Sequence, residues 1–272
     1  MKRKCAISNI SKKEKAELVR DARASCTGWE EYNMIKVQEL IVQEDDDIVA
    51  INKPAGLLSI PDREGKELSL KTMLKDRYGA IFTVHRLDKD TSGIVVFAKN
   101  ESAHRDLSIS FEARETEKIY NGLVLGKPVQ KEGVIDEPIA EHPVKKGTMT
   151  VYRKGKESIT EYEVLESFRL YSWMRFHILT GRTHQIRVHM KHLGHPIVCD
   201  ELYGDGKPVL ISSIKKKNYN LSKEAEEERP ILSRLALHAT SLKFSMKGKE
   251  YSFEAPLPKD LKALLQQLRK NN

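Results

Sequence analysis

The densest group of potentially reactive side chains lies in the segment from His85 to Gly93, which reads His-Arg-Leu-Asp-Lys-Asp-Thr-Ser-Gly. It places the carboxylate of Asp88 close to the cations of Arg86 and Lys89. Side chains in a turn between buried strands are held by the scaffold and still reach a ligand, so this carboxylate could act as a nucleophile or a base. Aspartate and serine are also common in turns because they bond turn amides. The segment by itself is compatible with both interpretations.

A second basic segment runs from Gly181 to His189 and reads Gly-Arg-Thr-His-Gln-Ile-Arg-Val-His. Its apolar spacing predicts a helix over residues 183–193, with Arg187 on a different face from Ile186. An arginine there could form a bidentate pair with a carboxylate across a cleft, and such a pair keeps the carboxylate ionised and oriented. A solvated basic helix, or one that faces nucleic acid, is the alternative that the spacing leaves open.

Tyr120 lies in a third segment, residues 117–124, whose alternation predicts a strand. Such a strand would place Tyr120 on the same face as Lys118 and Gly122, opposite Leu123. A tyrosine on an open face can stack on a planar base, and its hydroxyl can exchange a proton. A tyrosine packed at the edge of the core is the simpler alternative, and these residues alone do not decide between the two.

Neither a metal site nor a nucleotide cofactor is predicted. The five histidines from His177 to His195 follow one another at spacings of 7, 5, 3 and 3 residues, without an HExxH pattern. Arg187 and other cations among them would repel a divalent ion. The three cysteines are scattered and indicate neither a disulfide framework nor a zinc knuckle. The chain has no GxGxxG, GxxxxGKS or GxxxxGKT loop, so we expect a reaction without a cofactor.

The net charge gives a hint about the partner. The 272 residues include 47 Lys and Arg against 39 Asp and Glu, a formal net charge of +8. An excess of cations attracts a polyanion and releases its counterions, as in nucleic-acid binding, although a basic soluble protein needs no such partner. No apolar run approaches the ~18 residues of a membrane span, and no apolar stretch follows the charged N-terminus of the chain. We therefore expect no membrane segment or signal peptide, and a cytoplasmic protein.

Strand-like segments outnumber helical ones along the chain. This pattern predicts an α+β protein with a mixed, mainly antiparallel central sheet flanked by helices. Strands are expected at residues 48–51, 81–84, 94–98, 118–125, 158–165, 173–179 and 236–242. Helices are expected at residues 68–78, 101–111, 183–193 and 259–269. The predicted organisation is a helical basic leader over residues 1–40 and a catalytic domain over residues 41–272, with a surface insertion at residues 213–229.

These segments, in this order, resemble the RluA family of pseudouridine synthases. Residues 85–93 match the HRLDxxTSG signature of that family at every specified position, and residues 181–189 match its later GRTHQIRVH motif. Supporting matches lie at residues 51–61, 118–120, 195–200, 237–239 and 255–258. The resemblance spans residues 41–265, and the ordered set is far more specific than one short motif.

The resemblance implies an enzyme that isomerises uridine in RNA to pseudouridine, on a mixed, mainly antiparallel sheet with a central RNA-binding cleft. Asp88 corresponds to the essential aspartate, which attacks the ribose at C1′ or removes a proton at C2′; the sequence leaves both routes open. The uracil then detaches, rotates and rejoins through C5. Tyr120 corresponds to the tyrosine that stacks on the base and is implicated in removing the C5 proton. Arg187 corresponds to the basic residue that ion-pairs with the aspartate.

The same two motifs supply the candidate substrate-binding residues, which are His85, Arg86, Thr91, Arg182, His184 and Gln185. Arg86 corresponds to the arginine that helps to displace the target base from its stack. Extruding a uridine costs a few kcal/mol, which cationic contacts and a stacking aromatic can offset. The resemblance implies no metal and no organic cofactor.

The resemblance also carries expectations about partners. The expected substrate is structured RNA, either ribosomal RNA, transfer RNA or both, and the protein is expected to be a monomer. With its short leader, the chain resembles the compact family members that lack an N-terminal S4 RNA-binding module. Cys199 departs from the family pattern, because many relatives have glycine there. A non-catalytic RNA-binding or ribosome-assembly factor on the same fold is the alternative function.

Overall fold

The computed structural model describes residues 36–215 and 228–272. The chain divides between residues 39 and 40 into two units, and the second unit, residues 40–272, holds every strand described. Of the first unit only residues 36–39 are described, and they include the start of the short helix α3 (Val37–Leu40). The predicted leader over residues 1–40 therefore lies almost wholly outside the described residues.

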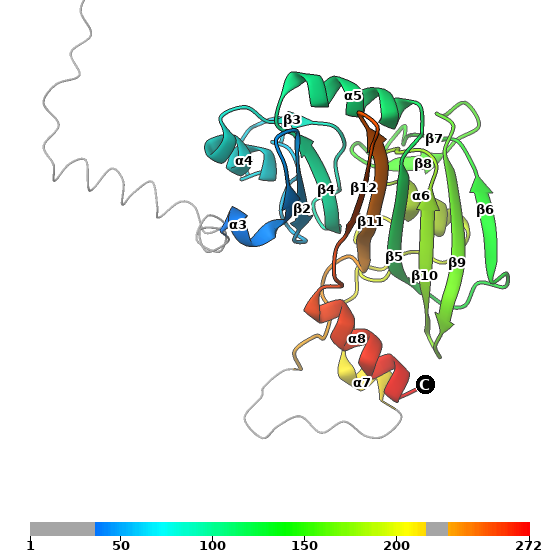
Figure 1. Ribbon diagram of the computed structural model, residues 1–272. Coiled ribbons are helices and arrows are strands. Elements are labelled where there is room, and N and C mark those ends of the chain that lie inside the picture. The colour runs from blue at the N-terminus through cyan, green and yellow to red at the C-terminus, as the bar shows by residue number, and fades with distance from the viewer. Residues whose placement is uncertain (1–35, 216–227) are drawn as a thin grey trace, which may run out of the picture. The chain divides into compact units, whose positions relative to one another are not determined.

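A ten-stranded sheet forms the centre of the second unit (Figure 1). Its main path runs in the order β1-β2-β4-β11-β5-β10-β9-β6, with β3 paired to β4 and β12 paired to β11. The strands are β1 (Ile41–Glu44), β2 (Ile48–Lys53), β3 (Phe82–Thr83), β4 (Ser92–Ala98), β5 (Glu117–Leu125), β6 (Glu132–Asp136), β9 (Ile159–Ser167), β10 (Tyr171–Ile178), β11 (Leu237–Met246) and β12 (Lys249–Glu254). Among the described strands, β4 and β11 are the one parallel pair. The predicted α+β class with a mixed, mainly antiparallel sheet is confirmed.

Helices and a small second sheet complete the unit. The elements are α4 (Leu70–Tyr78), α5 (Glu101–Glu112), β7 (Ile139–Glu141), β8 (Met149–Val151), α6 (Gln185–His192), α7 (Ile211–Ile214) and α8 (Lys259–Lys270). Asn100 caps the N-terminus of helix α5, and its side chain accepts a hydrogen bond from the amide of Ala103. It packs against β4 and β11 because Ala103 and Leu107 lie one turn apart on its buried face. Across residues 36–215 and 228–272, no helix is both long and apolar enough to cross a membrane.

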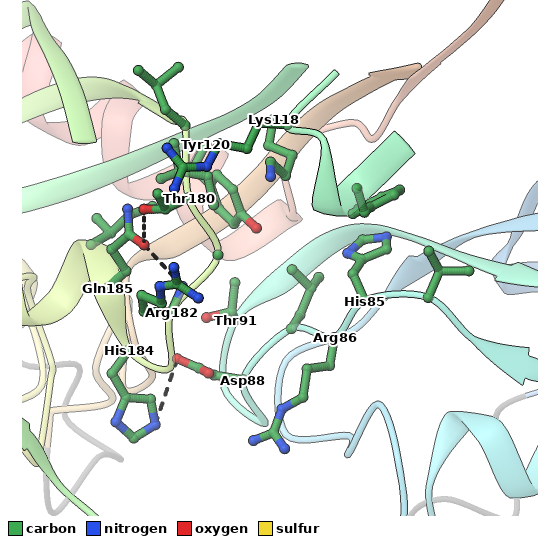
Figure 2. A pocket seen from close by; sticks show the side chains of 18 of the residues that line it. His85, Arg86, Asp88, Thr91, Lys118, Tyr120, Thr180, Arg182, His184 and Gln185 are labelled. Carbon is green, nitrogen blue, oxygen red and sulfur yellow. Dashed lines mark hydrogen bonds and ion pairs between the residues drawn. The ribbon is translucent and has the colours of Figure 1, made fainter. Parts of the chain in front are cut away.

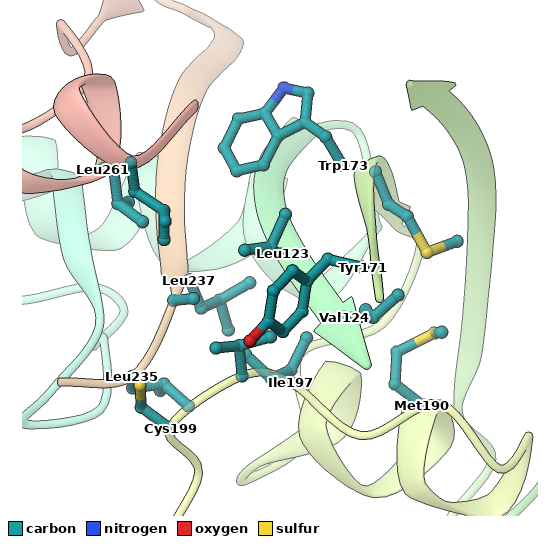
Figure 3. Close-up of a cluster of buried hydrophobic side chains, with 14 of the residues drawn as sticks. Leu123, Val124, Tyr171, Trp173, Met190, Ile197, Cys199, Leu235, Leu237 and Leu261 are labelled. Atoms are coloured by element: carbon teal, nitrogen blue, oxygen red, sulfur yellow. The ribbon is translucent and has the colours of Figure 1, made fainter. Parts of the chain in front are cut away.

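The main hydrophobic core joins β5 and β10 to helices α6 and α8 (Figure 3). Leu123 of β5, Met190 of α6 and Leu261 of α8 are all buried in it. Alternate residues of a strand point to opposite faces, so Leu123 and Tyr120 lie on opposite faces of β5. Tyr120 is half-buried and packs against the same core cluster. The core thereby fixes the two elements that carry Tyr120 and Arg187.

The parallel contact between β4 and β11 is short. It consists of two residue pairs, His238 with Ser92 and Ala239 with Gly93. Gly93 has φ +116°, and a Cβ placed there would lie 2.1 Å from the carbonyl oxygen of Ala239. Only glycine permits this close approach of the two backbones. The last residue of the HRLDxxTSG segment thus fixes where the loop that carries Asp88 joins the sheet.

Several predicted elements differ in extent from those observed. The helix predicted over residues 183–193 begins at Gln185, because His184 has φ +56° and so lies in the left-handed region, which cannot continue a right-handed helix. The strand predicted over residues 81–84 is limited to the two residues of β3. The sequence analysis missed β1, β6, β7, β8 and β12. Edge strand β6, for example, buries only Ile135, so it shows little hydrophobic alternation.

The sequence analysis noted two further features, Cys199 and a surface insertion at residues 213–229, and the structure describes the first fully and the second in part. Cys199 has φ +59°, a backbone conformation that favours glycine, the residue that the sequence analysis expected for many relatives there. The predicted insertion at residues 213–229 begins at the end of α7, and residues 228–229 are described at its other end. The rest of the predicted insertion, residues 216–227, lies outside the described residues.

Candidate active site

A cavity of about 560 Å³ is lined by the loop before β4, the end of α5, strand β5 and the loop that leads into α6. All nine residues predicted for the site contribute to its wall, and Figure 2 labels eight of them. The nine are His85, Arg86, Asp88, Thr91, Tyr120, Arg182, His184, Gln185 and Arg187. Segments that are far apart in the sequence therefore meet in one cavity.

The backbone around Asp88 is held on both sides. On one side, Ser59 Oγ donates to the carbonyl of Leu87 at 2.8 Å and accepts from its amide at 3.1 Å. On the other side, the fully buried Lys53 donates to the carbonyl of Lys89 at 2.9 Å. Burial lowers the pKa of Lys53 to about 7 despite the nearby acids. The sequence analysis placed Lys53 in a supporting segment and gave it no role.

Arg187 binds two aspartates. Its Nη1 donates to Oδ2 of Asp88 at 3.2 Å, while its Nε and Nη2 donate to Asp200 at 2.7 and 2.8 Å. Burial disfavours the charge of Arg187, but the hydrogen bonds and charges of Asp200 and Asp88 outweigh it and raise the pKa of the guanidinium. The bidentate partner of Arg187 is thus Asp200, and Asp88 receives a single bond. The sequence analysis placed Asp200 in a supporting segment, residues 195–200, and gave it no role.

A tyrosine that the sequence analysis missed orients His184. The amide of Met149 donates to the hydroxyl oxygen of Tyr203 at 2.7 Å, so the hydroxyl proton is free to bond Nδ1 of His184, also at 2.7 Å. This pattern assigns the proton of a neutral His184 to Nε2, which lies 3.9 Å from Oδ2 of Asp88. Burial lowers the pKa of His184, which favours that neutral form. The Tyr203 ring also lies 5.0 Å from the guanidinium carbon of Arg187.

Tyr120 extends from β5 into the cavity, as the predicted alternation requires. Burial, and then the charge of Asp88, raise the pKa of the Tyr120 phenol above its usual value. The hydroxyl therefore stays protonated at neutral pH. Tyr120 is half-buried and is positioned to present its ring and hydroxyl to a ligand next to Asp88.

Gln185 and Arg182 stabilise the loop that precedes α6. The Gln185 carbonyl oxygen accepts from the hydroxyl of Thr180 at 2.7 Å and from the amide of Arg182 at 3.0 Å. Its NH₂ group donates to the carbonyl of Ile159 and the hydroxyl of Thr160. Because both the oxygen and the NH₂ group of its amide are hydrogen-bonded within the protein, Gln185 shapes the cavity wall and offers no free donor to a ligand. Arg182 donates through Nε to the carbonyl of Glu157 at 3.0 Å.

His85 lies at the opposite end of the cavity from His184. Its Nε2 accepts from the amide of Val96 at 3.1 Å, and its ring stacks on Phe111 with the centroids 4.8 Å apart. Burial, followed by the charge of Lys118, lowers the pKa of His85 to about 3, so the ring is neutral. Arg86 is exposed at the cavity wall, and Thr91 is buried in it.

The five histidines that the sequence places between residues 177 and 195 contact partners on several segments of the chain. His177 bonds Glu161, and His195 bonds the carbonyl of Leu125. His189 bonds Thr160 and a backbone carbonyl, and His192 lies 4.0 Å from a carboxylate oxygen of Glu137. His184 bonds Tyr203, as described above. Among residues 36–215 and 228–272, no group of three or more metal-ligating side chains is arranged to hold an ion.

The sequence model of the RNA pseudouridylate synthase family matches residues 47–192. With this fold and this aspartate-containing cavity, the chain belongs to the RNA pseudouridylate synthases, in the RluA family that its motifs resemble. It is an isomerase that converts uridine in RNA to pseudouridine. The ribosomal large subunit pseudouridine synthase D of Escherichia coli (strain K12) is 37% identical over 245 residues, which cover 84% of this chain and 70% of the relative. Its namesake from Haemophilus ducreyi is 38% identical over 237 residues, with the same coverage.

Solved structures support the same assignment. The human RNA pseudouridylate synthase domain containing 4 superimposes with a TM-score of 0.64 and 26% sequence identity, covering 86% of this chain and 94% of that protein. The human domain containing 1 protein gives a TM-score of 0.62 and 27% identity, covering 84% of this chain and 94% of that one. The expected pseudouridine synthase fold is therefore confirmed.

Proposed function

We propose that Asp88 is the catalytic carboxylate of this isomerase. The observation that carries the proposal is the hydrogen bond from Arg187 Nη1 to Oδ2 of Asp88, at 3.2 Å, inside the cavity. The arginine pairs with the carboxylate and orients it. In the described part of the chain, Oδ1 of Asp88 has no hydrogen-bond partner. This second oxygen is the one that would attack C1′ of the ribose or take the C2′ proton.

Tyr120 would stack on the uracil while the glycosidic bond breaks and re-forms. Its hydroxyl is held neutral, so its role would be to relay the C5 proton rather than to remove it as a phenolate. We therefore expect Tyr120→Phe to bind RNA normally and to stall before the product forms, because the ring remains and the hydroxyl is lost. A gel-shift assay would measure binding, and chemical labelling of pseudouridine would measure turnover. Normal turnover would restrict Tyr120 to stacking.

The proposed substrate is ribosomal RNA of the large subunit, with transfer RNA as a further possible target. Two observations support a structured RNA: the net charge of +8 and the cations of Arg86 and Arg182 at the cavity wall. The names of the bacterial relatives support the ribosomal choice. We further propose that the protein acts as a monomer in the cytoplasm, with His85, Thr91 and His184 shaping the substrate pocket beside the two arginines.

The decisive experiment compares pseudouridine maps of cellular RNA with and without the gene. Chemical labelling is required, because uridine and pseudouridine have equal mass. We expect a defined uridine of large-subunit RNA to remain unmodified without the gene and to be modified again when wild type is returned. Asp88→Asn should not restore the modification. If it did, Asp88 would not be the catalytic carboxylate, and if only transfer RNA changed, the ribosomal assignment would be wrong. Turnover by purified wild type on the mapped RNA would exclude the non-catalytic RNA-binding alternative.

A further inference from the structure

Lys118 is a cavity cation that the proposed mechanism does not use. It lies on β5 two residues before Tyr120, lines the same cavity and is only 8% exposed. Its Nζ lies 5.7 Å from the centre of the Phe111 ring. Within residues 36–215 and 228–272, no carboxylate or carbonyl oxygen forms an ion pair or hydrogen bond with this ammonium group.

A buried ammonium group without a hydrogen-bond acceptor lowers the stability of the fold, because its charge has lost its water and gained no partner. Lys53, the other deeply buried lysine among the described residues, donates to three backbone carbonyls. Arg114, which also lines the cavity, is paired with Glu157 through two hydrogen bonds of 3.1 and 2.7 Å. Lys118 therefore differs from its cationic neighbours, and an oxygen of the bound substrate would supply the acceptor that the protein does not.

The sheet register orders the residues along the cavity. Tyr120 pairs with Ala239, which also pairs with Gly93, so Tyr120 lies level with the end of the loop that carries Asp88. Lys118 pairs with Leu242, farther along the same strand. Figure 2 agrees, because it shows Tyr120 between Asp88 and Lys118.

The shape of uracil fits this order. With the ribose at Asp88 and the base against Tyr120, ring atom C4 lies opposite the glycosidic N1, and O4 points toward Lys118. We propose that Lys118 donates a hydrogen bond to this carbonyl and so recognises uracil and stabilises it as a leaving group. The inference rests on the proposed role of Asp88. Cytosine would instead present an amino group to the ammonium, which would place two donors against each other.

The chemistry benefits from this contact by either route open to Asp88. When the C1′–N1 bond breaks, its electron pair goes to N1, and the negative charge spreads onto O2 and O4. An ammonium group already in place stabilises that charge without reorganisation. The rotation that brings C5 to the former position of N1 also exchanges C4 for C2, so Lys118 then faces O2. C5 then bonds to C1′, while Asp88 either leaves C1′ or returns the proton to C2′, according to the route. Net transfer of the C5 proton to N1, relayed by Tyr120, completes the isomerisation. Burial, and then Arg114, lower the pKa of Lys118, which makes its N–H a stronger donor.

The test measures single-turnover rates on a large-subunit ribosomal RNA fragment that carries either uridine or 4-thiouridine at the mapped target, since sulfur is a weak hydrogen-bond acceptor. We expect Lys118→Met to react about 100-fold more slowly on uridine, with RNA affinity nearly unchanged. Lys118→Arg should recover at least part of the rate. Replacing O4 of the target uridine by sulfur should slow wild type more than it slows Lys118→Met, because the variant has no ammonium N–H that could lose its acceptor. Equal 4-thio effects in both proteins, or a normal rate for Lys118→Met, would overturn the inference.

Controls separate the alternatives. Lys243→Met removes a lysine from the neighbouring strand that is paired with Glu117 at 2.9 Å, and its rate should be normal. If Lys118 held an RNA phosphate instead, Lys118→Met would weaken binding and reduce the salt slope by about one, which would overturn the uracil contact. Asp88→Asn on the same RNA distinguishes the two proposals. An inactive Asp88→Asn beside a fully active Lys118→Met would reject only this inference, and an active Asp88→Asn would reject the proposed function.

Discussion

Two aspartates share the guanidinium of Arg187, and they differ in nearly every physical respect. Asp200 is buried and accepts two hydrogen bonds from Arg187, together with bonds from the amides of Leu202 and Tyr203. Asp88 has a side chain that is 18% exposed, accepts one longer bond from Arg187 and lines the cavity. The difference indicates a division of labour, in which Asp200 anchors the arginine and Asp88 stays free to change its bonds.

This division has a consequence for the reaction. If Asp88 were the main support of Arg187, any change at its carboxylate would also release the arginine. Because Asp200 holds two of the guanidinium nitrogens, Arg187 can stay in place while Asp88 attacks the ribose or takes a proton. Removing each carboxylate in turn should therefore separate catalysis from stability.

The largest effect is expected from Asp88→Asn. We expect the single-turnover rate to fall at least about 10⁴-fold, because the reacting oxygen is replaced by an amide. The free energy of unfolding should change by less than about 1 kcal/mol, since the position is partly exposed and keeps an oxygen for Arg187. Chemical labelling of pseudouridine would measure the rate, and urea denaturation would measure the free energy of unfolding. A large loss of stability would mean that Asp88, too, is an anchor.

The next effect is expected from Asp200→Asn. It leaves Arg187 facing an amide that cannot accept at both positions, so we expect a loss of about 3–5 kcal/mol of unfolding free energy. The same change at Asp260 is a matched control, because Asp260 also forms a bidentate pair, with Arg234 at 2.6 and 2.7 Å, but its side chain is 36% exposed. Asp260→Asn should cost about 1 kcal/mol or less. Equal losses at the two sites would contradict the anchoring role of Asp200.

A smaller effect is expected from Tyr203→Phe. The amide of Met149 loses its acceptor, which should cost about 1–3 kcal/mol. Nδ1 of His184 loses its donor, so the pKa of the His184 imidazole should rise, and a protonated His184 would compete with Arg187 for Asp88. The acid limb of the pH–rate profile should therefore move to higher pH. The charges of Arg187, Asp200 and Arg86 act on the His184 imidazolium in the variant as they do in wild type. An unchanged profile would remove Tyr203 from the positioning of His184.

The pH dependence of stability should reveal the buried Lys53. Lys53 has a pKa of about 7 in the folded protein, below its usual value of 10.5, so the unfolded chain binds more protons between these two pH values. The contribution of Lys53 to the unfolding free energy should therefore rise with pH from about 7 to about 10.5. The difference in unfolding free energy between wild type and Lys53→Met should grow across this window, as thermal denaturation at several pH values would show. A difference that is constant with pH would mean that Lys53 is charged in the fold.

Local patterns in the sequence were sufficient for much of the fold, and the family resemblance supplied nine of the residues that line the cavity. The alternation in residues 117–124 predicted which face of β5 carries Tyr120, and the two motif segments contained the predicted residues that line the cavity. Such patterns work because burial repeats with the period of a strand or helix. Edge strands such as β6 lack that repeat and were missed.

The tertiary structure alone decided which groups bond to which. Asp88 and Arg187 are 99 residues apart, and the bidentate partner of the arginine is Asp200 rather than Asp88. The roles of Lys53 and Tyr203 depend on contacts between separate segments, and no spacing along the chain encodes them. The physical reason is that periodicity determines which face of an element is buried, while hydrogen bonds depend on sheet register and on loop geometry. Here the two-residue contact of β4 with β11 and the left-handed backbone of His184 set that geometry.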